Sequence, residues 1–453
     1  MTGAKTPPTP DGVPLLGNGY AFSRDPVGAM ESWAEHGDVV RLEMPGRSIH
    51  MVTDPDLIER ILVADQDRFS IGPAQREFFG GVEDHAVTTN TGDRWARLRR
   101  AMHPAFTRER IERYGDRMAA TTAAFVDGWA DGEHLDLPRE TRLLTVNVLA
   151  DSLLDADLSG DEAVVMDAAD ALIDRANFRR PGQLLPDWVP TPTERRFERA
   201  VGALDDYVAD LLAERRTDAG DGLGSDDAPA GPANRPDDVC SVLLAAHERG
   251  DLSLSEVRHN LVALLLAGHD SPATALTSAL LLLSDHPHVR ESLHEEYDAV
   301  VDGDRPSGED YEDLELTRNV VSETLRLYPP TTGVNRQATE PVTLGGYDLP
   351  AGAQFMLPQW VVHRDERFWD GPGTFDPSRW DGESDRPEYA YFPFSGGPRQ
   401  CIGSDFARRE LTLALATTVG RVDLDVSVDG PLTFAPSIQL RPETDIQATV
   451  RRR

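Results

Sequence analysis

The residues best suited to chemistry lie in a short glycine-rich segment near the C-terminus. The segment reads Phe394-x-x-Gly397-x-Arg399-x-Cys401-x-Gly403. Glycines let the backbone pass close to a flat ligand, and a helix that begins just after Cys401 would aim amide N–H groups at its sulfur. That arrangement favours the thiolate form of a cysteine. An isolated cysteine is more often a small buried hydrophobe, but the surrounding pattern favours a thiolate at Cys401.

A polar interruption in a long apolar segment is the second candidate. Ser253 and Glu256 stand at capping-box spacing, and the Leu- and Ala-rich segment that they open ends at about Asp285. About thirty residues at 1.5 Å each predict a central helix roughly 45 Å long. The polar residues 268–271 would be buried in the middle of this helix, where burial is costly unless the polar groups serve a purpose.

The cysteine segment resembles that of the cytochrome P-450 superfamily, the heme-thiolate monooxygenases, at all five specified positions. The resemblance implies that Cys401 is the axial ligand of the iron of heme b, whose reactivity the thiolate tunes. It places Arg399 against a heme propionate and Phe394 against the cysteine side of the heme, and it includes Gly403 in the same cofactor-binding loop. Cys240 matches no family position and is expected to be structural.

Three further positions agree with this resemblance. Trp95 and Arg99 stand four residues apart, on one face of a helix, and match the family's W-x-x-x-R. By resemblance both contact heme propionates, and Arg336 occupies another arginine position that the family uses in the same way. Without the resemblance, the tryptophan would be interpreted as a packing residue and the arginines as solvated side chains.

Glu323 and Arg326 match the family's E-x-x-R pattern ahead of a helix-ending proline pair. On its own, this spacing is more often that of an ordinary surface ion pair, which contributes little stability. The resemblance implies that both residues join Arg379 and hold the heme-binding core. Substitutions there should abolish heme incorporation rather than alter selectivity.

The central helix carries the residues that the resemblance assigns to dioxygen activation. The family's A-G-x-[DE]-[TS] motif fits residues 267–271, with Gly268 beside the cofactor. The hydroxyl of Ser271 would hydrogen-bond dioxygen, and the carboxylate of Asp270 would relay protons. Serine lacks the methyl group that fixes the rotamer of threonine, the commoner residue at this position.

Pro272 follows the motif directly and has no N–H to donate to the carbonyl of Gly268, four residues back. We therefore predict a local opening of the helix at Gly268, with a kink of no catalytic consequence as the alternative. His269 is expected to be a core residue that points away from the iron.

Composition limits the class of partner. The chain has 453 residues, 45 Lys plus Arg against 78 Asp plus Glu, and a net charge of −33. Such a charge opposes binding to nucleic acid and to anionic membranes. Lys5 is the only lysine, and acidic, lysine-poor chains resemble proteins of salt-loving archaea, whose repulsion concentrated salt screens. A merely acidic protein is the alternative, and a melting temperature that rises with potassium chloride would support the halophilic interpretation.

The pattern of apolar residues predicts a fold that is mainly α with small β-sheets. The resemblance implies a single cytochrome P-450 domain over residues 1–453, shaped like a triangular prism around a buried heme. Its proline-rich N-terminus is neither a signal peptide nor a membrane anchor, which predicts a cytoplasmic protein. We further expect a flexible N-terminus over 1–10, a flexible surface loop over 216–238, and strands near 38–43, 48–53, 342–357 and 421–449.

The function predicted from these residues is a monooxygenase acting on an apolar organic substrate of fatty-acid, carotenoid or terpenoid type. It would take two electrons from a ferredoxin or similar donor with its reductase. The alternatives are a peroxide-dependent peroxygenase or hydroperoxide isomerase on the same fold, and a non-catalytic heme carrier or sensor. The expected substrate walls are 70–90, 171–190, Ala263–Ala267, Thr331–Val334 and Pro436–Gln439, with Phe78, Phe79, Leu264 and Val334 among their apolar residues.

Overall fold

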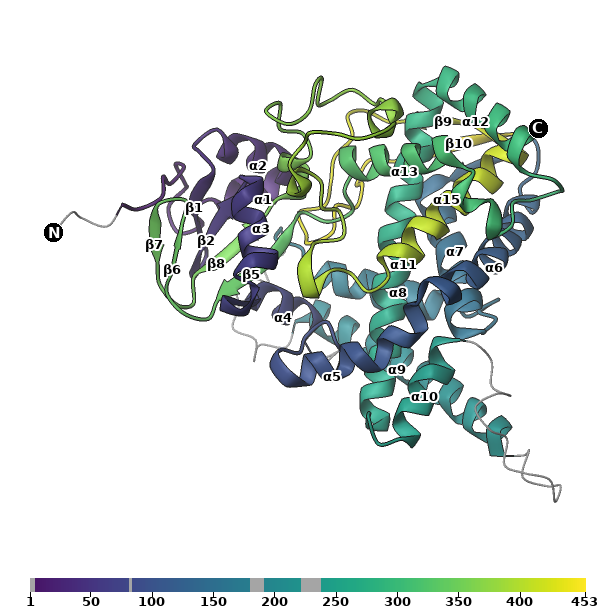
Figure 1. Ribbon diagram of the computed structural model, residues 1–453, viewed down its shortest axis with the longest axis horizontal. Coiled ribbons are helices and arrows are strands. Elements are labelled where there is room, and N and C mark those ends of the chain that lie inside the picture. The colour runs from purple at the N-terminus through teal and green to yellow at the C-terminus, as the bar shows by residue number, and fades with distance from the viewer. Residues whose placement is uncertain (1–4, 81–83, 180–190, 221–237) are drawn as a thin grey trace.

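The computed structural model of this protein describes residues 5–80, 84–179, 191–220 and 238–453. Helices build most of the molecule, and the largest sheet lies on the side from which the N-terminus leaves (Figure 1). The fold class is the predicted one, mainly α with small β-sheets. None of the helices in the described residues is both long enough and apolar enough to cross a membrane.

Several helices begin at an aspartate that caps the first turn ahead of a proline, as at Asp25, Asp54 and Asp136. The short helices are α1 (Gly19–Arg24), α2 (Pro26–Ala34), α3 (Pro55–Glu59), α4 (Pro73–Phe79) and α14 (Gln359–Val362). The long helices are α5 (Gly92–Met102), α6 (Arg108–Asp127), α7 (Leu137–Leu149), α8 (Glu162–Arg175), α9 (Pro192–Gly220), α10 (Val239–Glu248), α11 (Leu254–Asp285), α12 (Pro287–Val300), α13 (Glu315–Leu327) and α15 (Ser404–Arg421).

The strands form three sheets; those at 69–71, 134–136 and 334–338 were not predicted, and the others lie in or near the predicted ranges. The largest has the order β1 (Val39–Met44), β2 (Arg47–Val52), β8 (Gln354–Leu357), β5 (Val334–Ala338) and β3 (Phe69–Ile71). In this sheet the register sets Arg336 of β5 between Phe355 and Ile71, which fixes where its side chain begins. The other sheets are β4 (His134–Asp136), β10 (Ile446–Arg452) and β9 (Val422–Val428), and the pair β6 (Val342–Leu344) and β7 (Tyr347–Leu349).

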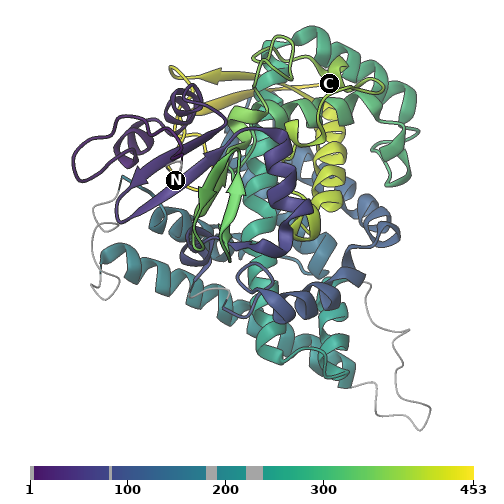
Figure 2. The same ribbon diagram turned by 60° about the vertical axis from the view of Figure 1, so that its left-hand side comes forward.

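The predicted central helix is α11, which runs through the middle of the molecule beside α15 (Figure 2). Its capping box is formed as expected, with the Glu256 N–H donating to Ser253 Oγ at 3.2 Å. It packs against α7, α9, α13 and α15, and most of its side chains are buried. This core position brings its polar residues into the interior, as the sequence indicates.

Pro272 does not break α11, which stays helical from Leu254 to Asp285. The predicted opening at Gly268 therefore does not interrupt the helix. A neighbouring helix supplies extra polar contact near this point, because Thr145 of α7 donates its hydroxyl to the carbonyl of His269 at 2.9 Å.

Two predicted flexible segments are only partly described. The helix α9 continues to Gly220, so residues 216–220 are helical rather than loop, while 221–237 lie outside the described residues. At the N-terminus, residues 1–4 are likewise outside them. Pro8 accepts a hydrogen bond from the Arg41 N–H at 2.8 Å, so this part of 1–10 pairs with β1.

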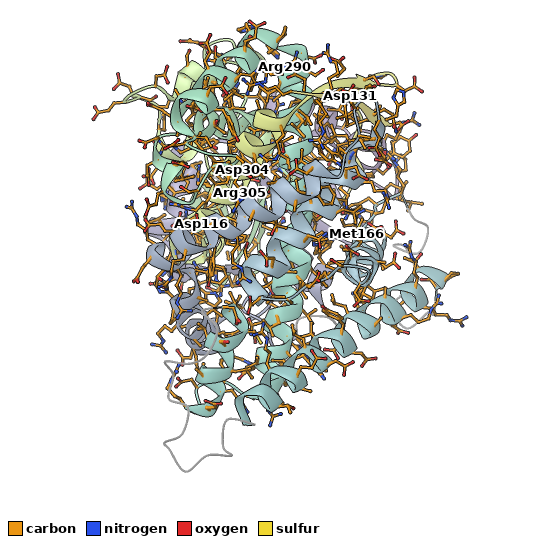
Figure 3. The ribbon with its side chains drawn as sticks, turned by 90° about the vertical axis from the view of Figure 1, so that its right-hand side faces the viewer. Asp116, Asp131, Met166, Arg290, Asp304 and Arg305 are labelled. Carbon is orange, nitrogen blue, oxygen red and sulfur yellow. The ribbon has the colours of Figure 1, made fainter. Side chains whose placement is uncertain are left out.

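Many of the acidic residues that dominate the composition lie on the outside of the fold. Asp116, Asp131 and Asp304 are exposed on the helical side of the molecule, where Arg290 and Arg305 also lie (Figure 3). Many of the surface arginines pair with these carboxylates, as Arg305 does with Asp304 at 3.5 Å. Exposed pairs of this kind contribute little stability each and are screened by salt.

Candidate active site

The Cys401 loop is closed by backbone hydrogen bonds just before α15 begins. The Cys401 N–H donates to the carbonyl of Phe394 at 3.0 Å, and Gly403 is the residue that precedes the first turn of α15. Gly397 has a φ of +64°, and a Cβ there would collide with the carbonyl of Leu62. The turn therefore requires glycine at this position.

The exposed surface of Cys401 faces a cavity of about 420 Å³ inside the molecule. This volume is typical of a small-molecule site. All the residues that the sequence proposes for cofactor binding and catalysis line it: Trp95, Arg99, Gly268, Asp270, Ser271, Arg336, Phe394, Arg399, Cys401 and Gly403. They belong to α5, α11, β5 and the Cys401 loop, so the fold brings together segments that are far apart in the sequence.

The protonation of Cys401 depends on more than its helix. Burial raises the pKa of the thiol, whereas the backbone N–H of Gly403 and the guanidinium of Arg99 lower it, and the net shift is upward. The helix N-terminus alone therefore does not yield the predicted thiolate. A metal cation would reverse the balance, because a coordinating thiol loses its proton.

Three guanidinium groups line the cavity without a carboxylate partner among the described residues. Arg336 donates to Ser395 Oγ at 3.3 Å, and Arg399 stacks 4.5 Å from the ring centre of Trp95. Burial lowers the pKa of Arg99, and lowers the pKa values of Arg336 and Arg399 to about 10. Buried cations are costly when unpaired, so this set fits a flat ligand that carries two carboxylates, as heme does.

Gly268 and Gly403 were both predicted to lie beside the cofactor, but their surroundings differ. At Gly268 an added Cβ would lie 2.8 Å from Leu149 Cδ1, so the glycine lets α7 approach α11 closely. At Gly403 an added Cβ would meet no protein atom within 4 Å. Packing within the described chain does not demand glycine at 403, whereas the close approach of a flat ligand would.

Asp270 is an ion-paired carboxylate rather than a free one. Arg441 donates through Nε to Asp270 Oδ2 at 2.9 Å, and Arg142 Nε lies 3.3 Å from Oδ1. Burial raises the pKa of Asp270, but Arg441, His269 and Arg142 more than offset this, and the net shift is downward. The proton-relay candidate is thus ionised and held by two arginines that the sequence did not single out.

The same arginines also bind Asp170 of α8. Arg441 Nη1 donates to Asp170 Oδ1 at 2.6 Å, and Arg142 Nη2 donates to the same oxygen at 2.7 Å. Because α8 also lines the cavity through Leu172, this cluster links the acid in α11 to a wall of the cavity. Ser271, its neighbour in the motif, lines the cavity.

His269 lies in the core, as predicted. It is fully buried, its Nδ1 lies 2.6 Å from the carbonyl of Leu265, and it is absent from the cavity lining. Burial lowers the pKa of this histidine to about 4, so its ring is neutral.

Glu323, Arg326 and Arg379 form the predicted structural cluster. Arg326 donates to Glu323 through Nε at 2.8 Å and through Nη2 at 2.7 Å, and Arg379 Nε lies 3.3 Å from Glu323 Oε1. Arg326 also donates to the carbonyls of His363 and Pro372. Since Glu323 and Arg326 are fully buried, this pair fixes the loop that leads toward Cys401.

The cavity walls match the predicted segments and add others. Leu149, Leu153 and Ala169 also line it but lie outside the predicted ranges, because no motif marks these positions. Residues 180–190 of the predicted wall lie outside the described residues. The predicted walls contribute Ile71, Gln75, Phe78, Phe79, Val87, Thr88, Leu172, Ile173, Ala263, Leu264, Leu266, Ala267, Thr331, Gly333, Val334, Ile438 and Gln439.

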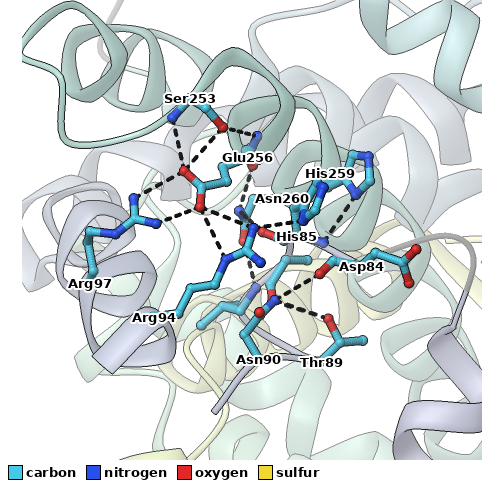
Figure 4. Close-up of polar contacts among 12 residues, drawn as sticks. Asp84, His85, Thr89, Asn90, Arg94, Arg97, Ser253, Glu256, His259 and Asn260 are labelled. Carbon is cyan, nitrogen blue, oxygen red and sulfur yellow. Dashed lines mark hydrogen bonds and ion pairs between the residues drawn. The ribbon is translucent and has the colours of Figure 1, made fainter. Parts of the chain in front are cut away.

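Residues 84–90 form a cavity wall that side chains of α11 hold in place (Figure 4). The Val87 N–H donates to Asn260 Oδ1 at 2.9 Å, and the His85 N–H donates to His259 Nδ1 at 3.2 Å. The rings of His85 and His259 stack at 4.9 Å. These hydrogen bonds attach residues 84–90, which have no regular secondary structure, to the helix α11.

Helix α5 completes this network. Arg94 Nη2 donates to His85 Nδ1 at 2.7 Å, and Arg97 Nη2 donates to Glu256 Oε1 at 2.6 Å (Figure 4). The hydrogen bond from Arg97 is the main reason that the pKa of Glu256 falls to about 2. Because a backbone N–H and a guanidinium both donate to imidazole nitrogens here, the network requires neutral rings at His85 and His259.

The family model for cytochrome P450 matches residues 7–450, nearly the whole chain. The chain belongs to the cytochrome P450 family. As a P450 it is an oxidoreductase that incorporates dioxygen, and it uses heme iron, an organic substrate and a redox partner. Cys401 and the three arginines, which line one cavity, are side chains of the kind that this cofactor needs.

Three similar P450s are named for terpenoid chemistry or oxygenation. Cyclooctatin synthase of Streptomyces melanosporofaciens is 33% identical over 91% of this chain and 88% of its own length. Pentalenene oxygenase of Streptomyces avermitilis is 31% identical over 93% of this chain and 91% of its own. Cyclooctat-9-en-7-ol 5-monooxygenase of Streptomyces melanosporofaciens is 30% identical over 91% and 88%.

Proposed function

We propose that this P450 hydroxylates a terpenoid-like substrate, with heme b as its cofactor and a ferredoxin as its electron donor. The observation that carries the proposal is one cavity that joins Cys401, the three unpaired arginines and the Asp270–Ser271 pair to mainly apolar walls. Terpenoid names among the similar proteins favour this class over fatty acids or carotenoids. The ferredoxin comes from the family resemblance, since no partner chain is described.

Heme would be held from two directions. Cys401 would ligate the iron, with Phe394 on the same side, while Arg99, Arg336 and Arg399 would bind the propionates and Trp95 would support Arg399. The bound heme supplies the site at which dioxygen is reduced and its oxygen transferred. The propionates would pair with arginines that have no carboxylate partner in the described residues, one of them the buried Arg336, so cofactor binding should also stabilise the fold.

Two residues of α11 would manage protons next to that site. The Ser271 hydroxyl can donate a hydrogen bond into the cavity and accept one in turn. Asp270 can pass a proton toward it only when the carboxylate is partly released from Arg441 and Arg142, because an ion-paired acid with a lowered pKa is a poor proton donor. We therefore infer that the four-residue cluster of Asp270, Arg441, Arg142 and Asp170 controls proton delivery.

The test is reconstitution of the holoprotein with heme b, a ferredoxin, its reductase and NADPH, with terpenes as substrates. Product that contains one oxygen atom from labelled dioxygen is the expected result. Product formed with hydrogen peroxide but never with ferredoxin and dioxygen would contradict the proposal and favour a peroxygenase. A substrate-induced spectral change without product under either condition would favour a carrier or sensor.

A further inference from the structure

Several polar side chains of the substrate walls are engaged with the protein itself. Thr331 Oγ1 donates to Gln359 Oε1 at 2.5 Å, and the Gln359 amide in turn donates to a backbone carbonyl at 2.7 Å. Gln75 donates to the carbonyl of Thr88 at 3.0 Å. Gln439 is different, because its Oε1 is buried and has no hydrogen-bond partner in the described part of the chain.

The backbone around Gln439 is held firmly, so its amide has a defined position in the wall. The Leu440 N–H donates to the carbonyl of Pro330 at 2.9 Å, and the Thr332 N–H donates to the carbonyl of Ile438 at 2.9 Å. The side chain of Leu440 is almost fully buried and anchors the segment. The amide therefore stands beside the 331–334 wall and is not a freely moving surface group.

Glu410 is the other cavity residue whose buried polar atoms lack a partner among the described residues. It lies on α15, about two turns beyond the start of this helix. The Cys401 loop and α15 together form one wall of the cavity, called the cysteine-loop wall. Burial raises the pKa of its carboxyl well above the usual range. Gln439 lies on a different segment, among the predicted substrate contacts. Ser437 Oγ of the same segment is also buried without a partner in the described residues, but Ser437 does not line the cavity, whereas Gln439 does.

A buried acceptor without a partner destabilises the structure that contains it, and a ligand that donates to it recovers this loss. A hydrocarbon cannot do so. A hydroxyl group can, and since the amide carries both a donor and an acceptor it matches a hydroxyl in either orientation. Sites built in this way reject analogues that lack the hydroxyl.

Building on the proposed function, we infer that Gln439 binds a hydroxyl group and that the substrate is a terpenoid alcohol rather than a terpene hydrocarbon. The hydrogen bond fixes one end of the molecule against the 331–334 wall and thereby selects the carbon that would face the heme on the side of Ser271. The reaction that supplies this substrate must introduce a hydroxyl group before this enzyme acts.

The experiment compares cedrane with cedrol, which differ only in a hydroxyl group, as ligands of the holoprotein. Binding is followed by the change in the visible heme spectrum, and products are analysed after turnover with ferredoxin. The wild-type protein should bind cedrol about tenfold more tightly, the effect of one buried hydrogen bond, and should oxidise it at few positions. In Gln439→Leu the preference should disappear and the products should become more varied.

Ile438→Leu is the matched control, because it alters the neighbouring cavity residue without changing polarity, and it should keep the preference for cedrol. The carbon monoxide spectrum of each variant checks that heme is bound normally. Equal binding of cedrane and cedrol by the wild type, with both oxidised, would overturn the inference and leave the proposed function intact. Failure of both to bind or react would count against the proposed function itself.

Discussion

The cysteine-loop wall and the wall formed by residues 84–90 face the same cavity but are held in different ways. Backbone hydrogen bonds and the fully buried Glu323–Arg326 pair fix the first. Side chains fix the second, and two of them are histidines that must stay neutral, His85 and His259. The second wall should therefore loosen in acid, because a protonated ring at His259 could no longer accept the hydrogen bond from the His85 N–H.

This difference also explains what the sequence could reveal. Tight turns such as the one at Gly397 accept only glycine, so the cysteine loop leaves a pattern of fixed spacing. The fold class was predicted from the spacing of apolar residues, whereas the ten proposed site residues came from the resemblance to the P450 family that this loop carries. The supports of the other wall are single polar residues, Asn260 and His259, that meet their partners only after folding. No spacing marks them.

The partners of Asp270 were missed for the same reason. Arg441 and Arg142 reach it from the C-terminal region and from α7, and ion pairs between distant segments leave no local signal. Gln439 lay in a predicted wall, but its unpaired amide is a property of the packed structure. Residues 216–220 were predicted as loop because Gly and Asp are poor helix formers, yet α9 extends through them.

The largest effect is expected at the buried pair of the cysteine-loop side. Glu323→Gln leaves Arg326 a buried charge without its partner, which costs about 3 to 5 kcal/mol. We expect little or no heme in the purified variant, measured by the ratio of heme to protein absorbance. Glu315→Gln, at the exposed start of the same helix, is the control and should bind heme normally. Normal heme content in Glu323→Gln would show that the pair is dispensable.

A smaller but still large effect is expected at Asp270. Asp270→Asn removes the carboxylate while keeping its shape, and turnover should fall about 100-fold, a typical contribution of a positioned acid or base. Substrate affinity, read from the visible spectrum, should stay within about twofold. Asp285→Asn, at the exposed end of α11, should behave as wild type. Unchanged turnover in Asp270→Asn would remove Asp270 from the proton pathway.

A moderate effect of pH is expected at the 84–90 wall. Burial and the neighbouring His85 lower the pKa of His259 below the ordinary value of 6.5. Asp205 and Asp84 oppose this shift and Arg258 supports it. A histidine whose pKa is lower in the folded than in the unfolded protein makes its full contribution to stability at pH values above 6.5. This contribution is lost as the pH falls below 6.5, because the unfolded state then binds more protons than the folded state.

Substrate affinity of the wild type should therefore weaken about threefold between pH 7.5 and about pH 5.5. In His259→Gln the amide oxygen can still accept from the His85 N–H but does not titrate, so the loss should be smaller. His36→Gln, at an exposed position after α2, should keep the wild-type pH profile. An identical profile in His259→Gln would show that the wall does not respond to protonation.

The smallest expected effect is that of salt on stability, which acts on the acidic surface rather than on either cavity wall. With a net charge of −33, added salt should screen repulsion between many exposed carboxylates. We expect the melting temperature of the holoprotein to rise steadily between about 0.1 and about 2 M potassium chloride. Heme binding at fixed temperature should change little, because Cys401 and its arginines are in the interior. A melting temperature independent of salt would contradict the halophilic interpretation.

The central claim is that Cys401 ligates heme iron as a thiolate in the cavity described. The most direct measurement is the difference spectrum of the reduced holoprotein with carbon monoxide. The account predicts the thiolate-type band in the wild type and in Cys240→Ala, whose cysteine is buried away from the cavity, and its loss in Cys401→Ala. The thiolate-type band persisting in Cys401→Ala, or absent from the wild type, would contradict it.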